Sequence, residues 1–351
     1  MASTRVIGLD IGTTAVRAAE LEFSGRGKTG QSATLLRYAE APLPYGAVRD
    51  GEVAEPATVS TILRQLWSRA KFGTRDVVIG VGNQRVLVRE IELPWMPPAQ
   101  IKETLPFQVQ ESLPMSTDEA LLDFFATDEV SGPQGRTLRG MLVAAQRDTV
   151  NANVVAVEGA GLRPTMVDLN AFALLRALAR GDMSSRVVAF VEIGAAVTDV
   201  IVSAQGVPRL VRTLPSGGQN VTQAIASGLG VAAPDAEAIK RELGVAHQYP
   251  AGQEAAGEAI GAVTRTLVEA IRNTFVYYQG NHPGAGIEGV VLTGGGAHLP
   301  GLGQYLSSAS RLPVALGDAL VGVRRPKKGP DLVGFESRIA MPVGLAFGVA
   351  A

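Results

Sequence analysis

The sequence predicts an α/β protein with two similarly folded lobes and a nucleotide bound between them. The first observation is the segment Val6–Leu21, whose pattern is an apolar strand, a glycine turn and a return strand. The second is the recurrence of this pattern about half a chain later, at Val187–Ser203, with Glu192 in the place of Asp10. The third is the run Gly294–Gly296 between an apolar strand and a helix, where glycines let the backbone approach a ligand closely. Two half-length copies of one hairpin predict two lobes of the same fold.

Composition narrows the class of function. A chain of 351 residues is expected to form about two domains, and its formal charge of −1 gives no electrostatic footprint for nucleic acid. Without cysteine there is no disulfide and no cysteine-based metal site. No apolar run reaches about 18 residues, so no transmembrane helix is expected, and the N-terminus lacks the arrangement of a signal peptide. We therefore expect a cytoplasmic protein.

The first hairpin carries groups that suit a nucleotide phosphate. Its first strand ends at Asp10, Gly12 permits a sharp turn, and Thr13 and Thr14 offer hydroxyls and amides. Such a turn points several backbone N–H groups in one direction, as a phosphate requires. The carboxylate of Asp10 suits a hydrated Mg²⁺. A single hairpin of this kind is more often a plain structural turn, but its repetition favours a ligand site.

Further elements follow the first hairpin. The sequence predicts a polar hairpin tip at Ser24–Ser32, a strand at Ala33–Tyr38 and a strand at Val77–Val81. Between the two strands, apolar residues recur every three or four positions and predict a helix over Glu55–Lys71.

The block Val86–Ala145 has a different pattern, which predicts a small domain inserted into the first lobe. An alternating strand opens it, followed by a helix and two further strands, and the helix that comes next is counted with the same inserted domain. The helix within the block has one apolar stripe, formed by Ile101, Leu105, Val109 and Leu113.

The second half continues with alternating helices and strands. After the repeated hairpin come two helices, the second of which places Glu237, Lys240 and Arg241 on one face, and then a long amphipathic helix. The apolar segment that ends the chain predicts a buried closing helix. The basic loop Val323–Gly329 is expected to be a solvated surface and is assigned no site.

Taken in order, these motifs resemble the nucleotide fold of actin, Hsp70 and the sugar kinases. More closely, they resemble the PilM family of type IV pilus assembly proteins, which is related to FtsA. The matching stretches are LDIGTTAVRAAEL, VREIELPWMPPAQIKETLPFQVQESLP, AEAIKRELG, LTGGGAHLPGL and PVGLAFG. The resemblance implies an actin/Hsp70-like two-lobed fold with duplicated five-stranded sheets and an FtsA-type inserted domain.

The resemblance also implies subdomain boundaries. We expect the first lobe (1A) at 1–75, the inserted subdomain (1C) at 76–162 and the crossover helix of 1A at 163–185. The second lobe (2A) would take 186–228 and 286–330, subdomain 2B 229–285, and the closing helix returning to 1A 331–351.

Carried over residue by residue, the resemblance implies an ATP and Mg²⁺ site. Asp10 and Glu192 would stand on the metal side, and Arg17 takes the place of a phosphate-binding lysine, which a guanidinium can replace. The cofactor-binding residues would be Asp10, Gly12, Thr13, Thr14, Arg17, Glu192, Gly194, Ala195, Ala196, Gly217, Gly218, Glu237, Lys240, Arg241, Gly294, Gly295 and Gly296.

Two departures from the family pattern bear on turnover. Glu192 replaces the aspartate usual in the second hairpin. Asn170 stands where many relatives carry a carboxylate that orients the attacking water, and an amide cannot accept a proton from that water. We therefore expect ATP binding with slow hydrolysis at most, and no catalytic residue.

The family binds the short cytoplasmic tail of the inner-membrane protein PilN, so a PilN-like N-terminal peptide is the expected partner. Phe107 and Gln110 lie off the apolar stripe of the inserted helix and are the expected contact residues. Self-association is an open alternative, and membrane contact is expected only through partners. Two other functions are weighed: a polymerising FtsA-like cell-division protein, and a sugar or carboxylate kinase of the same fold.

Overall fold

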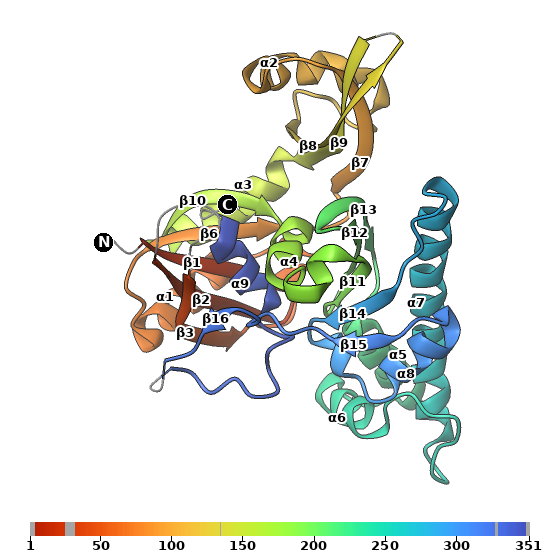
Figure 1. The fold of residues 1–351 in the computed structure, drawn as a ribbon. Coiled ribbons are helices and arrows are strands. Elements are labelled where there is room, and N and C mark those ends of the chain that lie inside the picture. Colours follow the sequence, from red (N-terminus) through yellow and green to blue (C-terminus); the bar gives the residue numbers. More distant parts are fainter. Residues whose placement is uncertain (1–3, 25–31, 134, 327–328, 349–351) are drawn as a thin grey trace.

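The computed structural model describes residues 4–24, 32–133, 135–326 and 329–348, which form two lobes and a smaller domain projecting from them (Figure 1). Most of the predicted hairpin tip at 24–32, two residues of the basic loop and the last three residues of the chain lie outside the described residues. Among the helices described, none is both long enough and apolar enough to cross a membrane.

The sheet of the first lobe is built around β1 (Thr4–Ile11). On one side β1 pairs antiparallel with β2 (Ala15–Ser24), which pairs antiparallel with β3 (Ser32–Pro42). On the other side β1 pairs parallel with β6 (Asp76–Val81), which pairs parallel with β10 (Arg163–Leu169). The buried apolar residues of β1 and β6 are typical of central strands covered on both faces.

The sheet of the second lobe repeats this plan strand for strand. On one side the central strand is followed by two strands joined by antiparallel pairings, and on the other side by two strands joined by parallel pairings. In spatial order the strands are β13 (Val207–Leu214), β12 (Thr198–Ala204), β11 (Val187–Ile193), β14 (Gly289–Thr293) and β15 (Val314–Leu316). The duplicated five-stranded sheets are thus confirmed, and the first gains a sixth short strand, β16 (Val323–Arg324), parallel to β3.

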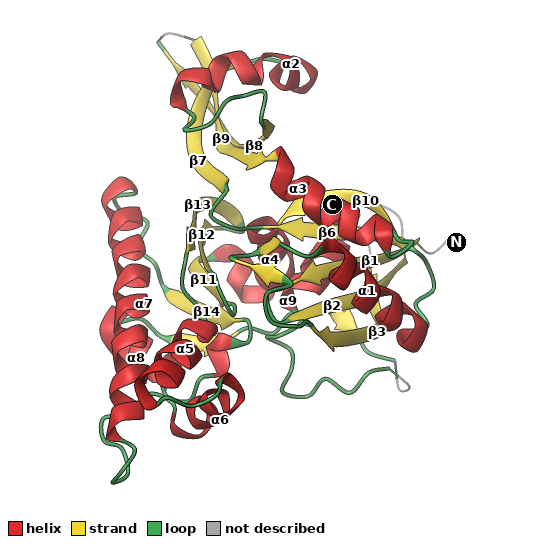
Figure 2. Cartoon of the chain, turned by 180° about the vertical axis from the view of Figure 1, so that it is seen from behind, coloured by secondary structure: helices red, strands yellow, loops and turns green. Residues whose placement is uncertain are grey.

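Two helices lie between the sheets (Figures 1 and 2). They are α4 (Asn170–Leu178) and α9 (Ala340–Phe347), and one hydrophobic cluster joins them to residues of both sheets. The backbones approach closely at two glycines. A Cβ on Gly8 of β1 would lie 1.9 Å from the carbonyl oxygen of Pro342, and one on Gly344 would lie 1.9 Å from that of Ala173. Only glycine fits at either position.

The remaining helices cover the outer faces. In the first lobe these are α1 (Pro56–Ala70), predicted correctly, and α3 (Arg147–Gly159), next to the short strands β4 (Val48–Arg49) and β5 (Glu52–Val53). In the second lobe α7 (Glu254–Asn281) and α8 (Leu302–Ser310) pack on the sheet. Beyond them, α5 (Gly218–Leu229) and α6 (Ala233–Leu243) form a separate cluster with α7.

The projecting domain consists of a three-stranded sheet and one helix. The strands are β7 (Val86–Pro94), β9 (Gly135–Gln146) and β8 (Ala120–Gly132), in that order, and the helix α2 (Pro98–Val109) continues into a single 3₁₀ turn (Gln110–Ser112). Ile101, Leu105 and Val109 are buried in its own small core, as their spacing predicts.

One predicted boundary needs correction. Residue 76 was expected to begin the inserted subdomain, but β6 belongs to the sheet of the first lobe because its apolar residues pair between β1 and β10. Helix α3, which was also assigned to the insertion, packs against α1 and so covers the first lobe. The other boundaries stay predictions.

The close approach of α9 generates a stability prediction. We expect Gly344→Ala to lower the free energy of unfolding by about 1–3 kcal/mol or more, because the added methyl overlaps the backbone of α4. Gly261→Ala in α7 is the control: nothing lies within 4 Å of its Cβ, so it should raise stability by about 0.5–1 kcal/mol. Urea unfolding of both variants measures this, and equal effects would contradict the packing described.

Candidate nucleotide site

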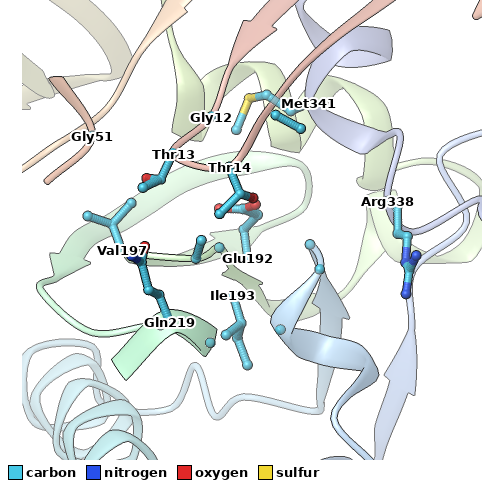
Figure 3. Close-up of a pocket in the computed structure, with 18 of the residues that line it drawn as sticks. Gly12, Thr13, Thr14, Gly51, Glu192, Ile193, Val197, Gln219, Arg338 and Met341 are labelled. Atoms are coloured by element: carbon cyan, nitrogen blue, oxygen red, sulfur yellow. The ribbon is translucent and has the colours of Figure 1, made fainter. Parts of the chain in front are cut away.

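A cavity of about 650 Å³ lies between the two lobes. The first lobe contributes the turn between β1 and β2, and the second lobe contributes the turn between β11 and β12 together with the glycine run after β14. Figure 3 shows Thr13 and Thr14 on one side of this cavity and Ile193 and Gln219 on the other. Every predicted cofactor residue except Ala196 lines it, as does Asn170.

The two turns have the same geometry. In the first, the N–H of Gly12 donates to the carbonyl of Ala15 over 3.0 Å, and in the second the N–H of Gly194 donates to that of Val197 over 2.9 Å. Cross-strand pairing also corresponds, since Asp10 pairs with Arg17 and Glu192 with Asp199. The repeat seen in the sequence is therefore a structural repeat.

The first turn offers side-chain donors as well as amides. The side chains of Thr13 and Thr14 project toward the cavity in Figure 3, and within the described part of the chain neither hydroxyl makes a hydrogen bond. The second turn, with Ala195 and Ala196, has only backbone groups to offer. Uncommitted donors facing a cavity are what an anionic ligand requires.

Arg17 is held by carboxylates. Its guanidinium lies 3.3 Å from Asp10 and 3.3 Å from Glu40, which pairs with it across β2 and β3. Burial opposes the charge, but the Asp10 and Glu40 carboxylates together hold the pKa of Arg17 above its usual value. Arg17 thus neutralises part of the acid in the cavity before any ligand enters.

Three of the carboxyl groups that line the cavity, on the two hairpins, have raised pKa values. Burial raises the pKa of Asp10, although Arg17 opposes the shift. Burial, with the charges of Asp199 and Asp10 adding to it, raises the pKa of Glu192 well above its usual value. Burial also raises the pKa of Asp199 to about 6, although the Thr213 hydroxyl donates to it over 2.5 Å. A bound cation would stabilise the ionised form of all three.

These oxygens fit Mg²⁺ held through water. In the described residues, no three acidic or histidine side chains are grouped closely enough to cage a metal. Mg²⁺ keeps several of its waters and commonly binds through one or two carboxylates plus substrate phosphates. Asp10 and Glu192, on facing lobes, suit that mode.

The far end of the cavity is formed by the predicted polar face of α6. Glu237 accepts from Lys240 over 2.6 Å and from Arg241 over 2.8 Å, and Lys240 also donates to the carbonyl of Gly218 over 3.0 Å. The three side chains lie on one face, as the sequence predicts, and they fix the start of α5 beside them.

The start of α5 is joined to the second turn. The N–H of Gly218 donates to the carbonyl of Gly194 over 2.9 Å, and a Cβ on Gly217 would lie 2.6 Å from that same oxygen. The N–H group of Gly218, at the start of α5, is therefore already hydrogen-bonded within the protein, and this bond positions the second turn.

The glycine run separates into structural and open positions. Gly294 has φ +83°, and a Cβ on Gly296 would lie 2.4 Å from Ile193, so the fold itself requires both. A Cβ on Gly295 would meet nothing within 4 Å. Gly295 therefore faces free space in the cavity wall.

Sequence reasoning missed several residues of the cavity. Asp199 is the second-lobe counterpart of Arg17, and aligning the two hairpins in full would have found it. Glu40 is found only once β2 and β3 are paired. His298, Ser337 and Arg338 also line the cavity, and Ser337 accepts from or donates to His298 over 2.8 Å. Because His298 is far from Ser337 and Arg338 in the chain, no local sequence pattern indicated that they line one cavity.

The raised pKa of Asp199 predicts that neutralising this residue raises the free energy of unfolding, by an amount that depends on pH. Its folded pKa exceeds the unfolded value of 3.8, so ionisation costs stability as the pH rises through about 6. We expect Asp199→Asn, which keeps the acceptor for Thr213, to raise the free energy of unfolding by up to about 3 kcal/mol at pH 8 and by less at pH 5. Exposed Asp182→Asn is the control. Equal increases in the free energy of unfolding at both pH values would contradict the raised pKa of Asp199.

Comparisons with known proteins agree with this geometry. The family described as type IV pilus assembly protein PilM matches residues 8–349. The solved PilM–PilN type IV pilus biogenesis complex is similar at a TM-score of 0.83, with 26% identity and 98% of each chain covered.

More distant proteins share the fold. MreB5 of Spiroplasma citri matches at a TM-score of 0.54, with 14% identity over 99% of this chain and 96% of that one. The cell division protein FtsA of Bacillus subtilis (strain 168) is 26% identical over 63% of this chain, which spans 56% of FtsA. The similarities confirm the actin-like fold. The chain belongs to the PilM family of type IV pilus assembly proteins.

Proposed function

We propose that this protein is an ATP-binding scaffold of a type IV pilus assembly platform, and that it binds the cytoplasmic N-terminal tail of a PilN-like membrane protein. Its place would be the cytoplasmic face of the inner membrane, through that partner. The observation that carries the nucleotide site is that two equivalent glycine turns from different lobes face one cavity. The partner is supported by the solved relative, which is a complex of PilM with PilN.

In this proposal each part of the cavity has one task. The two turns bind phosphates, Gly295 lies against the adenosine, and Glu237, Lys240 and Arg241 border the ribose and base. Asp10 and Glu192 would hold Mg²⁺ through water, and the ion would neutralise phosphate charge. Distant relatives of the same fold support a nucleotide: MreB5 of Spiroplasma citri was solved with ADP and with AMPPNP.

The open space at Gly295 allows a direct test. We expect Gly295→Val to weaken ATP binding at least tenfold, because its side chain would occupy the space given to the ligand, while the melting temperature stays unchanged. Isothermal titration calorimetry with Mg-ATP measures the affinity, and a thermal melt gives the melting temperature. Gly261→Val, remote from the cavity, is the control for adding a β-branched residue. An unchanged affinity for Mg-ATP would show that the glycine run is not part of the site.

Slow turnover is proposed from the polar wall of the first lobe. The cavity there is lined by Asn83, Thr149, Asn153 and Asn170, and the buried side-chain oxygen of Asn170 has no hydrogen-bond partner among the described residues. Amides can hold a water beside a terminal phosphate, but they cannot take its proton. Glu52, which accepts from Thr149 over 3.3 Å, is also engaged by Arg85 over 3.0 Å and by Asn83 over 3.3 Å. A kinase would need a freer base here.

We therefore expect ATP turnover well below about 1 per second in the wild-type protein. Asn170→Asp should raise it by about 10²-fold, since a positioned base contributes about 10²–10⁴-fold. A phosphate-release assay measures both, with Asn151→Asp on the exposed side of α3 as control. Fast wild-type turnover, or no response to Asn170→Asp, would contradict the role given to Asn170.

The partner surface is proposed on the inserted domain. Phe107 is 80% exposed and Gln110 is also exposed, whereas Leu105 and Val109 on the same helix are buried. An exposed aromatic side chain can anchor a partner, since aromatic residues are enriched among the residues that dominate binding energy at interfaces. An extended tail beside it could gain affinity from main-chain hydrogen bonds at an edge strand of the sheet.

We expect Phe107→Ala to weaken binding of a synthetic PilN-like N-terminal peptide about tenfold or more, without changing the melting temperature. Fluorescence anisotropy gives the affinity. Tyr45→Ala, which removes an equally exposed aromatic (85%) from the first lobe, is the matched control. A fall in both affinity and melting temperature would make Phe107 structural, and no change in either would place the groove elsewhere.

A further inference from the structure

The inserted domain is attached to the first lobe by the chain, yet it is bound to the second lobe by an ion pair. Both guanidinium nitrogens of Arg209, in β13, donate to the two carboxylate oxygens of Asp128, in β8, one of them over 3.2 Å. The chain enters the domain from β6 and leaves it into α3, which both belong to the first lobe. The Arg209–Asp128 contact, here named the bridging ion pair, therefore joins the inserted domain to the second lobe outside the cavity.

Two irregularities of the sheets direct the partners of this pair toward each other. In β13 the pairing with β12 shifts by one residue, and Arg209 is the residue left unpaired. In β8 the pairing with β9 shifts at Thr127, directly before Asp128. The Thr127 hydroxyl donates to the Asp128 carboxylate over 2.9 Å and fixes it. β-Bulges of this kind redirect side chains, and two of them at one contact are a feature of the fold rather than a defect.

The surroundings hold the pair in a partly dry environment. The Arg209 side chain is only 20% exposed, and its hydrogen bonds lower the pKa of Asp128. The ring of Phe125, also in β8, lies 5.2 Å from that of Phe172 in α4. A bidentate pair between planar groups fixes orientation as well as distance. These contacts join the inserted domain to α4 and to the second lobe, where β7 also lies beside β13.

One strand connects the pair to the cavity. Arg209 lies near the start of β13, and Thr213, four residues further along the same strand, donates to Asp199 in the cavity wall. Four residues of extended chain span about 13 Å. This hydrogen bond links Asp199 in the cavity wall to the strand that carries Arg209.

We propose that the Arg209–Asp128 ion pair couples occupancy of the cavity to the position of the inserted domain, and so to its partner-binding surface. The proposal rests on the function proposed above for its ligands, but the ion pair itself is tested without any ligand. Breaking it weakens the attachment of the inserted domain to the second lobe, leaving the contact between β7 and β13, while both binding sites keep their residues.

The ligand-free test uses the absence of cysteine in the chain. Spin labels at Lys102→Cys in α2 and Glu269→Cys in α7, both exposed, report the distance between the inserted domain and the second lobe by pulsed electron resonance. We expect Asp128→Asn to broaden or shift this distance distribution, and the exchanged pair Asp128→Arg with Arg209→Asp to restore it. Glu92→Gln, which breaks the Arg139–Glu92 pair inside the inserted domain, is the matched control and should change nothing. An unchanged distribution in Asp128→Asn overturns the proposal.

The coupling test compares peptide affinity with and without saturating ATP. In the wild-type protein we expect the two affinities to differ by about fivefold or more, and in Asp128→Asn to become equal. A ratio unaffected by Asp128→Asn overturns the proposal. If neither ATP nor peptide binds the wild-type protein, the proposed function fails, whereas the spin-label distances still decide whether the ion pair holds the domain.

Discussion

Close packing of helices α4 and α9 between two sheets is the constraint on which the rest of the structure depends. Gly8 and Gly344 let three backbones meet where no side chain fits, and the shared cluster of buried residues makes the two lobes one body at their base. Because each central strand ends at this base, the turns that follow β1 and β11 open onto a single cavity. The position of the site is therefore determined by how the two sheets are joined, and the turns only supply its hydrogen-bond donors.

The electrostatics of the cavity follow from the same duplication. Equivalent strand positions carry Asp10 and Glu192, and the positions opposite them carry Arg17 and Asp199. One half is internally neutralised by an ion pair, whereas the other combines two acids, both with raised pKa values. At these four hairpin positions the acid excess lies on the second hairpin, so a cation that enters with an anionic ligand would be drawn to that side. This asymmetry distinguishes two turns that are alike in backbone.

Local signals predicted most of the fold, and long-range pairing decided what they missed. Both hairpins, helix α1 and the buried stripe of Ile101, Leu105 and Val109 were predicted because their patterns are periodic within a few residues. The placement of β6 was wrong, since an apolar strand beside an insertion does not show which sheet it joins. Glu40 and Arg209 act through contacts across strands, and Arg338 reaches the cavity from a distant segment. No local pattern could have identified them.

Hydrogen–deuterium exchange with and without Mg-ATP tests the central claim most directly, namely that turns from both lobes bind one nucleotide. We expect ATP to protect three segments together: 11–15 in the first lobe, and 193–197 and 294–296 in the second. These segments lie far apart in the sequence and meet only at the cavity. Protection confined to one lobe, or none at saturating ATP, would contradict the claim.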